Sequence, residues 1–371
     1  MSRFLISCGG TGGHLAPGIA LAEGLQARGH ETRLLISDKK VDARMVEKYG
    51  AFTFLCVPGS PFGWSPLTLL RCAMTQPLGL GFCLRLARSW RPDAIVGFGG
   101  FTSAPAVLAG RTLGIPVALH EANRVPGRAI RQLGRFARRI YLPPGVRLDS
   151  VPAAAIRHVG LPVRREVARR DPASARSALG LDPSRPVLAI LGGSQGAVAL
   201  NNWVRSRLNS FAAAGIQVYC VTGLGKGWDG ASVVKAEGAG ARMIFVPFSD
   251  RIPDVISAAD LVVSRAGAGT LAELVRCGTP AVLVPFPQAA DNHQAANAGY
   301  FAQEGGGLVV PQTALDGLEA TVLRVMRDEN LRDEFRANLR RMDLADNLGT
   351  LLRDLEDVTV RGGDNGALAV A

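Results

Sequence analysis

The sequence has 371 residues, of which 47% are hydrophobic and 20% are charged, and it contains 44 glycines and six cysteines. This length accommodates two domains of ordinary size, and this composition excludes an intrinsically disordered chain. The cysteines are scattered and form no C-x-x-C or Cys/His cluster. We therefore expect neither a zinc site nor a disulfide framework, as suits a reducing cytoplasm.

Positive charge is concentrated in the first part of the chain. Residues 1–160 contain 20 Lys and Arg against 8 Asp and Glu, whereas residues 161–371 contain 22 against 23. This asymmetry indicates an anionic partner, either nucleic acid or an anionic membrane surface, unless the arginines only solvate one face. No nucleic-acid-binding motif occurs and the arginines lack interleaved aromatic residues, so we expect no nucleic acid partner.

The chain opens with a predicted strand, a glycine-rich turn and a helix. The apolar residues 4–7 lead into CGGTGGH (8–14), and the helical pattern of 17–30 has Pro17 near its start and Gly29 at its end. Further strands are predicted at 32–37, within 93–101 and within 116–123. Strands that alternate with helices predict a parallel, doubly wound sheet.

The segment 63–90 is largely apolar, and Arg71, Arg85 and Arg88 are its only charged residues. We expect its prolines and glycines to break it, so that no transmembrane helix forms and the segment makes an interfacial membrane patch. Residues 124–139 add six arginines, which anionic headgroups would attract. The alternative is that 63–90 packs as an ordinary core loop and helix.

The strand, glycine turn and helix pattern restarts in 186–204, and strands are predicted in 216–223, 242–248, 260–267 and 280–287. We therefore expect an α/β protein of two Rossmann-like, doubly wound parallel-sheet domains with a cleft between them. The predicted domains are 1–162 and 163–342, and a helix at about 343–360 is expected to pack back on the first.

Three segments of the sequence are suited to a nucleotide. The turns GGTGGH (9–14) and GGSQGA (192–197) each lead into a helix, whose first N–H groups favour a diphosphate; tight turns without a ligand are the alternative. A third helix is expected to start near Thr270, with Glu273 in about its first turn, where it would accept hydrogen bonds from a ribose or serve only the helix dipole. The polar run 291–297 is suited to sugar hydroxyls.

Seven ordered motifs resemble those of the MurG glycosyltransferases: GGTGGHLAPGIALAEGL (9–25), GFGGFTSAPAVLAG (97–110), HEAN (120–123), GLPVR (160–164), GGSQGA (192–197), SRAGAGTLAEL (264–274) and DNHQAANA (291–298). The resemblance implies the GT-B fold and transfer of GlcNAc from UDP-GlcNAc to the C4 hydroxyl of MurNAc in lipid I. It also implies a peripheral enzyme at the cytoplasmic face of the bacterial plasma membrane. Another UDP-sugar-dependent GT-B enzyme and a UDP-GlcNAc epimerase remain alternatives.

The resemblance also assigns site residues, most of which would bind the donor. Glu273 matches the acid that binds the ribose, and His293 with Gln294 matches the pair near the GlcNAc hydroxyls. The remaining donor contacts match Thr11, Gly12, Gly13, Asn123, Arg164, Ser194, Gly267, Ala268, Gly269 and Thr270. The sequence departs from the usual pattern at Phe101, Ala122, Leu161 and Gln288, where Tyr, Gln, Asn and His are common.

Catalysis by direct displacement requires a base for the acceptor hydroxyl. His14 is the first candidate, because histidine titrates in the right range, and a residue that only shapes the helix start is the alternative. Glu121 is the second candidate, as base or as orienting partner. No D-x-D motif occurs in the sequence, so we expect no essential metal ion and no cofactor.

Overall fold

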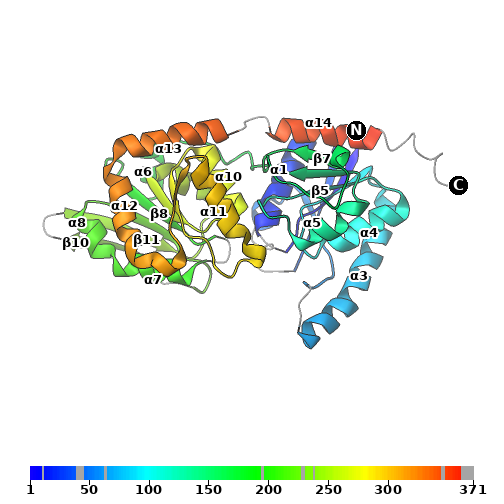
Figure 1. Ribbon diagram of the computed structural model, residues 1–371, viewed down its shortest axis with the longest axis horizontal. Helices are drawn as coiled ribbons and strands as arrows, with labels where there is room; N and C mark the ends of the chain where they lie inside the picture. The colour runs from blue at the N-terminus through cyan, green and yellow to red at the C-terminus, as the bar shows by residue number, and fades with distance from the viewer. Residues whose placement is uncertain are drawn as a thin grey trace. The chain divides into compact units, whose positions relative to one another are not determined.

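The computed structural model describes residues 1–10, 12–38, 46–61, 65–193, 196–226, 230–236, 239–343 and 347–360. The chain divides into two compact units, each shown in Figure 1. The amino-terminal unit contains Met1–Arg164 and the helix α14 (Asn347–Val360), and the carboxyl-terminal unit contains Arg165–Leu344. The predicted limits were residues 162 and 342.

The amino-terminal unit is built on a parallel sheet whose described strands have the order β3-β2-β1-β4-β5-β6-β7. In this order Ile6 of β1 lies beside Leu34 of β2 on one side and Val96 of β4 on the other. Its elements are β1 (Arg3–Ser7), α1 (Gly12–Ala27), β2 (Glu31–Ile36), β3 (Thr53–Cys56), α3 (Pro66–Trp90), β4 (Ala94–Gly97), α4 (Ser103–Leu113), β5 (Val117–His120), α5 (Arg128–Leu133), the 3-10 turns η1 (Gly134–Phe136) and η2 (Ala153–Ala155), β6 (Arg139–Leu142), β7 (Ile156–His158) and α14.

Helices cover both faces of this sheet. Because side chains alternate along each strand, neighbouring residues of one strand are buried in opposite cores. Phe4 and Ile6 are fully buried in the core that α1 and α14 share. Leu5, between them in β1, is fully buried in the opposite core beneath α3, α4 and α5. Both faces are therefore apolar, which explains why β1 reads as a continuous hydrophobic run.

α14 is held on the amino-terminal unit by packing and by charge. Its residues Leu351, Leu352 and Leu355 are buried in the same core as α1. A Cβ atom at Gly24 of α1 would lie 2.9 Å from Leu352 Cδ1, so the two helices approach closely at this glycine. The carboxylate of Asp354 accepts a 2.8 Å hydrogen bond from the Tyr141 hydroxyl and pairs with Arg139 at 2.8 Å.

The carboxyl-terminal unit contains a second sheet, whose described strands have the order β10-β11-β9-β8-β12-β13-β14. Its pairs are parallel except for β10 with β11. The elements are α6 (Pro172–Ala178), β8 (Val187–Leu191), α7 (Val198–Ser206), α8 (Leu208–Ala213), β9 (Gln217–Val221), β10 (Gly230–Ala236), β11 (Ala239–Val246), α9 (Ile252–Ala258), β12 (Leu261–Ser264), α10 (Ala268–Cys277), β13 (Ala281–Leu283), η3 (Ala290–Asn292), α11 (His293–Gln303), β14 (Gly307–Val309), η4 (Gln312–Gly317), α12 (Leu318–Arg327) and α13 (Glu329–Met342).

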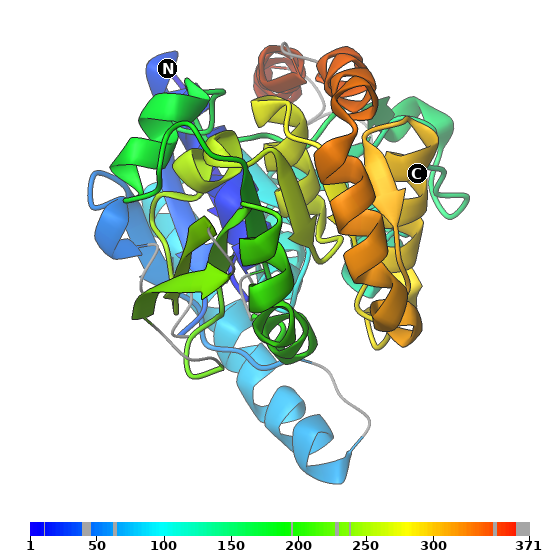
Figure 2. The same ribbon diagram turned by 90° about the vertical axis from the view of Figure 1, so that its left-hand side faces the viewer.

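The expectation that prolines and glycines break the segment 63–90 is wrong, because α3 is continuous from Pro66 to Trp90. Ser65 caps its first turn and Arg91, in a left-handed conformation, ends it. Pro77 removes one backbone hydrogen bond, and packing of the following turns against α4 compensates for that loss. By length and composition alone, α3 is long and apolar enough to cross a membrane. Figures 1 and 2 show it extending away from the sheet of its unit.

A second correction concerns α1, which begins at Gly12 and therefore earlier than the predicted 17–30. Pro17 lies inside the helix. Pro17 therefore lacks the N–H that would have donated to the carbonyl of Gly13, and it costs the helix one backbone hydrogen bond. Because α1 begins at Gly12, Gly12, Gly13 and His14 are residues of its first turn rather than of the preceding loop.

The contribution of α14 to the amino-terminal unit can be measured by replacing Leu355, which is fully buried. We expect Leu355→Ala to lower the free energy of unfolding of this unit by about 2–5 kcal/mol, because it leaves a cavity beneath the helix. Asp357→Ala changes an exposed position of the same helix and should cost less than about 0.5 kcal/mol. Equal effects of the two variants in urea unfolding would show that α14 adds no packing energy.

Candidate functional site

The neighbouring strands β1, β4 and β5 end at the same edge of the amino-terminal sheet, because they are parallel. The segments that follow them are the glycine loop 8–10 with the start of α1, the loop 98–102, and the HEAN segment that begins at His120. The first two are joined inside the protein, where the buried Thr102 hydroxyl donates to the carbonyl of Gly9 at 3.2 Å. The segments that carry the predicted site residues His14, Glu121 and Asn123 therefore follow strands that end at one edge of the sheet.

His14 is half-buried in the first turn of α1, and its ring lies against the loop after β4. A Cβ atom at Gly100 would lie 3.2 Å from His14 Nδ1, and one at Gly99 would lie 3.6 Å from Nε2. Both glycines have positive φ, at +72° and +91°, where other residues are strained. Gly100 therefore leaves room for the imidazole, and both glycines permit the loop conformation against which it lies.

Glu121 is 4% exposed, and both of its carboxylate oxygens accept hydrogen bonds from its own loop. One oxygen accepts from the backbone N–H and the side-chain amide of Asn123, at 2.8 and 3.0 Å. The other accepts from the backbone N–H of Gly127 at 2.7 Å. This arrangement fixes the loop and orients the Asn123 amide. Of the two roles expected for Glu121, the geometry favours the orienting one.

His120, the first residue of HEAN, is a core residue. Its side chain is 1% exposed and stacks on Phe98, with ring centroids 5.2 Å apart. Burial lowers the pKa of His120 to about 4, so the imidazole is neutral at pH 7. The ring therefore contributes packing rather than proton transfer near neutral pH.

The remaining predicted site residues of the amino-terminal unit differ in solvent exposure. Gly12 is half-buried and Gly13 is exposed. Arg164, at the end of this unit, is 8% exposed and donates to the Tyr49 hydroxyl at 3.1 Å. Two predicted site residues, Thr11 and Ser194, lie outside the described residues.

In the carboxyl-terminal unit, two glycines of the turn after β8, Gly192 and Gly196, have no room for a side chain. A Cβ atom at Gly192 would lie 2.4 Å from the Ala197 nitrogen, and one at Gly196 would lie 2.5 Å from the Thr222 carbonyl oxygen. The buried Asn201 of α7 then donates to the carbonyl oxygens of Thr222 and Lys226, at 2.9 and 3.0 Å. These contacts hold the turn beside the segment that follows β9.

The segment after β12 presents the start of α10. Gly267 is its N-cap residue and has no side chain to satisfy the first N–H groups, and Gly267 to Thr270 are all half-buried. Such a helix start favours an anion. Glu273 is the sixth residue of the helix, because α10 begins at Ala268 and not near Thr270 as predicted. It therefore lies in the second turn, half-buried.

His293 and Gln294 begin α11, directly after Asp291 and Asn292, whose φ angles are both positive, at 50° and 53°. His293 Nδ1 lies 2.7 Å from the carbonyl oxygen of Ala290, so Nδ1 carries a proton and Nε2 faces away from this contact. The Gln294 side-chain oxygen accepts from the Phe286 N–H at 2.9 Å. This leaves the amide nitrogen of Gln294 as a donor.

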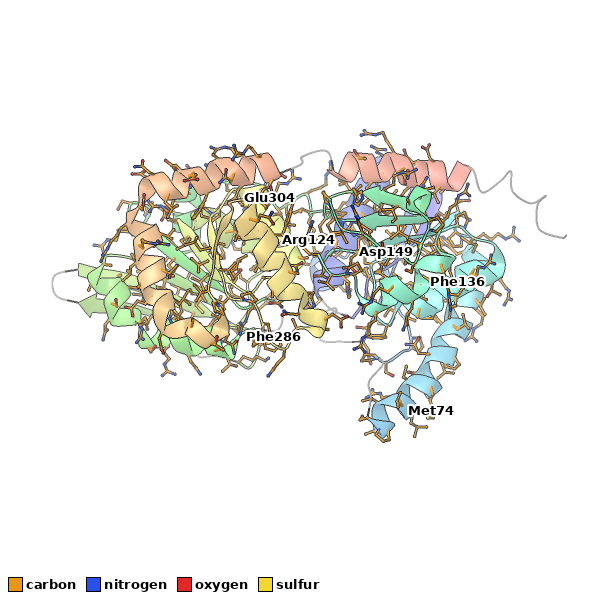
Figure 3. All side chains as sticks on the ribbon, in the orientation of Figure 1. Met74, Arg124, Phe136, Asp149, Phe286 and Glu304 are labelled. Atoms are coloured by element: carbon orange, nitrogen blue, oxygen red, sulfur yellow. The ribbon has the colours of Figure 1, made fainter. Side chains whose placement is uncertain are left out.

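Arg265 was not among the predicted site residues, although it directly precedes Ala266 and the N-cap Gly267. Its side chain is 7% exposed and donates to the carbonyl oxygens of Val284 and Pro285 at 3.0 and 3.2 Å, and to Gln312 at 2.5 Å. It also lies 5.4 Å from the ring centroid of Phe286, which Figure 3 labels. The guanidinium thus ties the segments after β12 and β13 together. Burial lowers its pKa from the ordinary value.

Comparison with known proteins identifies a glycosyltransferase domain in each of the two units. Residues 4–142 match the glycosyltransferase family 28 N-terminal domain, and residues 187–348 match the C-terminal domain of the same family. The UDP-N-acetylglucosamine--N-acetylmuramyl-(pentapeptide) pyrophosphoryl-undecaprenol N-acetylglucosamine transferase of Opitutus terrae is 58% identical over 100% of this chain and 99% of its own. The protein of the same name from Parasynechococcus marenigrum is 39% identical over 87% of this chain and 86% of its own.

Solved structures agree on the fold. The crystal structure of Acinetobacter baumannii MurG matches with a TM-score of 0.72 at 24% identity, over 96% of this chain and 100% of that one. The calicheamicin glycosyltransferase CalG4 matches with a TM-score of 0.67 at 15% identity, over 97% and 99%. The expected GT-B architecture of two α/β units with parallel sheets is therefore confirmed. With both domain models matched in order and 58% identity over its full length, the chain belongs to the MurG family of glycosyltransferases.

Proposed function

We propose that this chain transfers GlcNAc from UDP-GlcNAc to the C4 hydroxyl of MurNAc in lipid I, with inversion at the anomeric carbon, and so produces lipid II for peptidoglycan synthesis. The observation that carries the proposal is the 58% identity over the whole chain to the Opitutus terrae transferase, whose name states this donor sugar and acceptor. The proposal is tested by supplying UDP-GlcNAc and a lipid I analogue and identifying the product.

The donor is assigned to the carboxyl-terminal unit. The first N–H groups of α10, which no side chain caps, suit the diphosphate, and the half-buried Glu273 carboxylate suits the two ribose hydroxyls. The Gln294 amide and His293 Nε2 suit the hydroxyls of GlcNAc. The remaining donor contacts are assigned by motif match to Thr11, Gly12, Gly13, Asn123, Arg164 and Ser194.

The general base is assigned to His14. As the C4 oxygen of MurNAc attacks the anomeric carbon, its proton passes to the imidazole, the bond to UDP breaks, and UDP leaves with the electron pair. His120 is unsuited to this step because it is buried with a pKa of about 4. Glu121 is unsuited because both of its oxygens accept hydrogen bonds within the loop. Its role is to orient Asn123.

Replacement of the base should reduce the rate of the chemical step and leave the affinity for the donor unchanged. We expect His14→Ala to lower kcat by about 10²–10⁴-fold, the usual contribution of general base catalysis, in a steady-state assay with UDP-GlcNAc and a lipid I analogue. His158→Ala removes an exposed histidine of the same unit and should leave kcat unchanged. Turnover of His14→Ala within about threefold of the wild type would refute the base assignment.

The reaction is proposed to need no divalent metal ion. The charge that develops on UDP would be stabilised by the N–H groups at the start of α10 and in the 192–197 turn. We therefore expect excess EDTA to leave the initial rate unchanged within experimental error. Loss of turnover in EDTA that added Mg²⁺ or Mn²⁺ restores would contradict this mechanism.

The acceptor is a polyprenyl lipid, and α3 is the element proposed to reach the membrane from the cytoplasmic side. Leu67, Met74 and Leu78 are 75%, 65% and 63% exposed, and Figure 3 labels Met74 on the part of α3 that stands clear of the sheet. The later turns of α3 bury Cys83, Ala87 and Trp90 within the unit. The turns of α3 that precede Thr75, residues 66–74, rise only about 14 Å, which is too short to cross a hydrocarbon layer of about 30 Å. We therefore infer that α3 lies in the membrane interface and that the protein is peripheral.

Exposed basic residues lie on α3 itself and on α5. Arg71, Arg85 and Arg88 of α3 are exposed, as are Arg128 and Arg131 of α5. α3, α4 and α5 share the core on one face of the sheet, so the helices that carry these arginines lie on one side of the unit. Anionic headgroups would attract each of them by about 1 kcal/mol when near the surface.

Vesicle binding should therefore depend on charge and on the apolar residues of α3. We expect the protein to sediment with vesicles that contain anionic lipid, and less as salt increases, because counterions screen the arginines. The double variant Leu70→Ser, Met74→Ser should bind less at every salt concentration, whereas Val309→Ser, an exposed apolar position of the other unit, should bind as the wild type does. Equal binding to neutral vesicles would argue against the electrostatic part.

A further inference from the structure

The helix α3 is hydrogen-bonded to two loops through a single side chain. The amide nitrogen of Gln76 donates to the carbonyl oxygen of Ser60 at 3.1 Å and to that of Phe101 at 3.4 Å. The neighbouring Thr75 supports the first of these contacts, because its hydroxyl lies 3.0 Å from that of Ser60. Gln76 therefore joins the segment after β3 to the loop after β4.

Phe101 lies between two glycines. A Cβ atom at Gly10 would lie 3.2 Å from Phe101 Cε1, and one at Gly59 would lie 3.1 Å from Cδ2. These atoms belong to opposite edges of the ring, so the ring fills the space between the first glycine loop and the segment that Gln76 holds. Neither glycine could carry a side chain unless Phe101 moved.

The contacts continue from Phe101 to His14. Gly10 belongs to the loop that leads into α1, and Gly100, next to Phe101, lies against the His14 imidazole. The same loop is fixed on its buried side by Thr102, which donates to the Gly9 carbonyl oxygen. A displacement of the Phe101 backbone would thus move Gly100 and, with it, the surface against which the His14 imidazole lies.

We propose that Gln76 is a positioning residue of the transfer reaction, which holds Phe101 against Gly10 and thereby fixes the His14 imidazole. This inference rests on the proposed function, because the positioned group is the proposed base. It also gives the ring of Phe101 a role in the absence of the tyrosine hydroxyl that is common at this position. Gln76 itself touches no reacting atom.

The test compares Gln76→Leu, which removes both N–H donors and keeps a similar volume, with Gln26→Leu. Gln26 is a matched control because it also donates one side-chain hydrogen bond from a helix, to Thr32 at 2.9 Å, at the far end of α1. With UDP-GlcNAc and a soluble short-chain lipid I analogue, we expect kcat of Gln76→Leu to fall about tenfold, since small displacements of a catalytic group are costly. The KM for UDP-GlcNAc should change less than kcat, because most of the assigned donor contacts belong to the carboxyl-terminal unit.

Two further measurements separate positioning from a loss of folding or of membrane contact. Gln76→Leu should sediment with anionic vesicles as the wild type does, because the exposed apolar residues of α3 remain. In a double-mutant cycle with Phe101→Leu, the losses in kcat should be clearly less than additive, since both changes release the same loop. If Gln76→Leu does not fold, Gln76→Asn, which is too short to reach both carbonyls, takes its place in both measurements.

The outcomes distinguish this inference from the proposed function. The positioning role would be overturned if Gln76→Leu kept the kcat of the wild type, or if the losses in kcat of Gln76→Leu and Phe101→Leu were additive in the double variant. Either result leaves the proposed function standing as long as the wild-type protein transfers GlcNAc. A rise in the KM for UDP-GlcNAc with no fall in kcat would also overturn the positioning role. A wild-type protein that transfers no GlcNAc to lipid I would instead refute the proposed function itself.

Discussion

The parallel pairing of β1 with β4 is the constraint on which the amino-terminal site depends. It brings together two loops that are about ninety residues apart in the chain, and the buried hydrogen bond from Thr102 to the Gly9 carbonyl oxygen joins them. β5 adds the Glu121 loop on the other side of β4. Because parallel strands require crossovers, each loop emerges at the same edge. The position of His14 is thus a consequence of strand order more than of local sequence.

Much of this arrangement could be predicted from the sequence, because its signals are local. Apolar runs that end in glycine mark β1, β4 and β8, and the glycines before Thr270 place the start of α10 to within two residues. The strands β3, β6, β7, β10 and β14 were not predicted; β7 and β14 have only three residues each, and β6 lies beside arginines. The sequence left two roles open for Glu121 and did not single out Arg265, because their partners are backbone groups, Gly127 N–H and the Val284 carbonyl, which the fold brings near.

The incorrect prediction for α3 has an instructive cause. Proline and glycine were taken as helix breakers, but Gly79 serves close packing: a Cβ atom there would lie 2.4 Å from the carbonyl oxygen of Pro58. The glycine therefore permits the segment after β3 to approach the helix, next to the place where Gln76 bonds Ser60. Tertiary packing outweighs the weak helix propensity of these residues. One helix can consequently be exposed at one end and fixed to the site loops along its middle.

The return of α14 to the amino-terminal unit means that this unit is not continuous in the chain. Residues 165–344, a complete second unit, are inserted between its sheet and the helix that covers one of its faces. Since synthesis proceeds from the amino terminus, Leu25 and the apolar face of α1 emerge from the ribosome long before Leu351 and Leu352 can bury them. The second unit can finish folding first. During that interval the amino-terminal unit presents an uncovered apolar surface, a state in which chaperone binding and aggregation compete with completion of the fold.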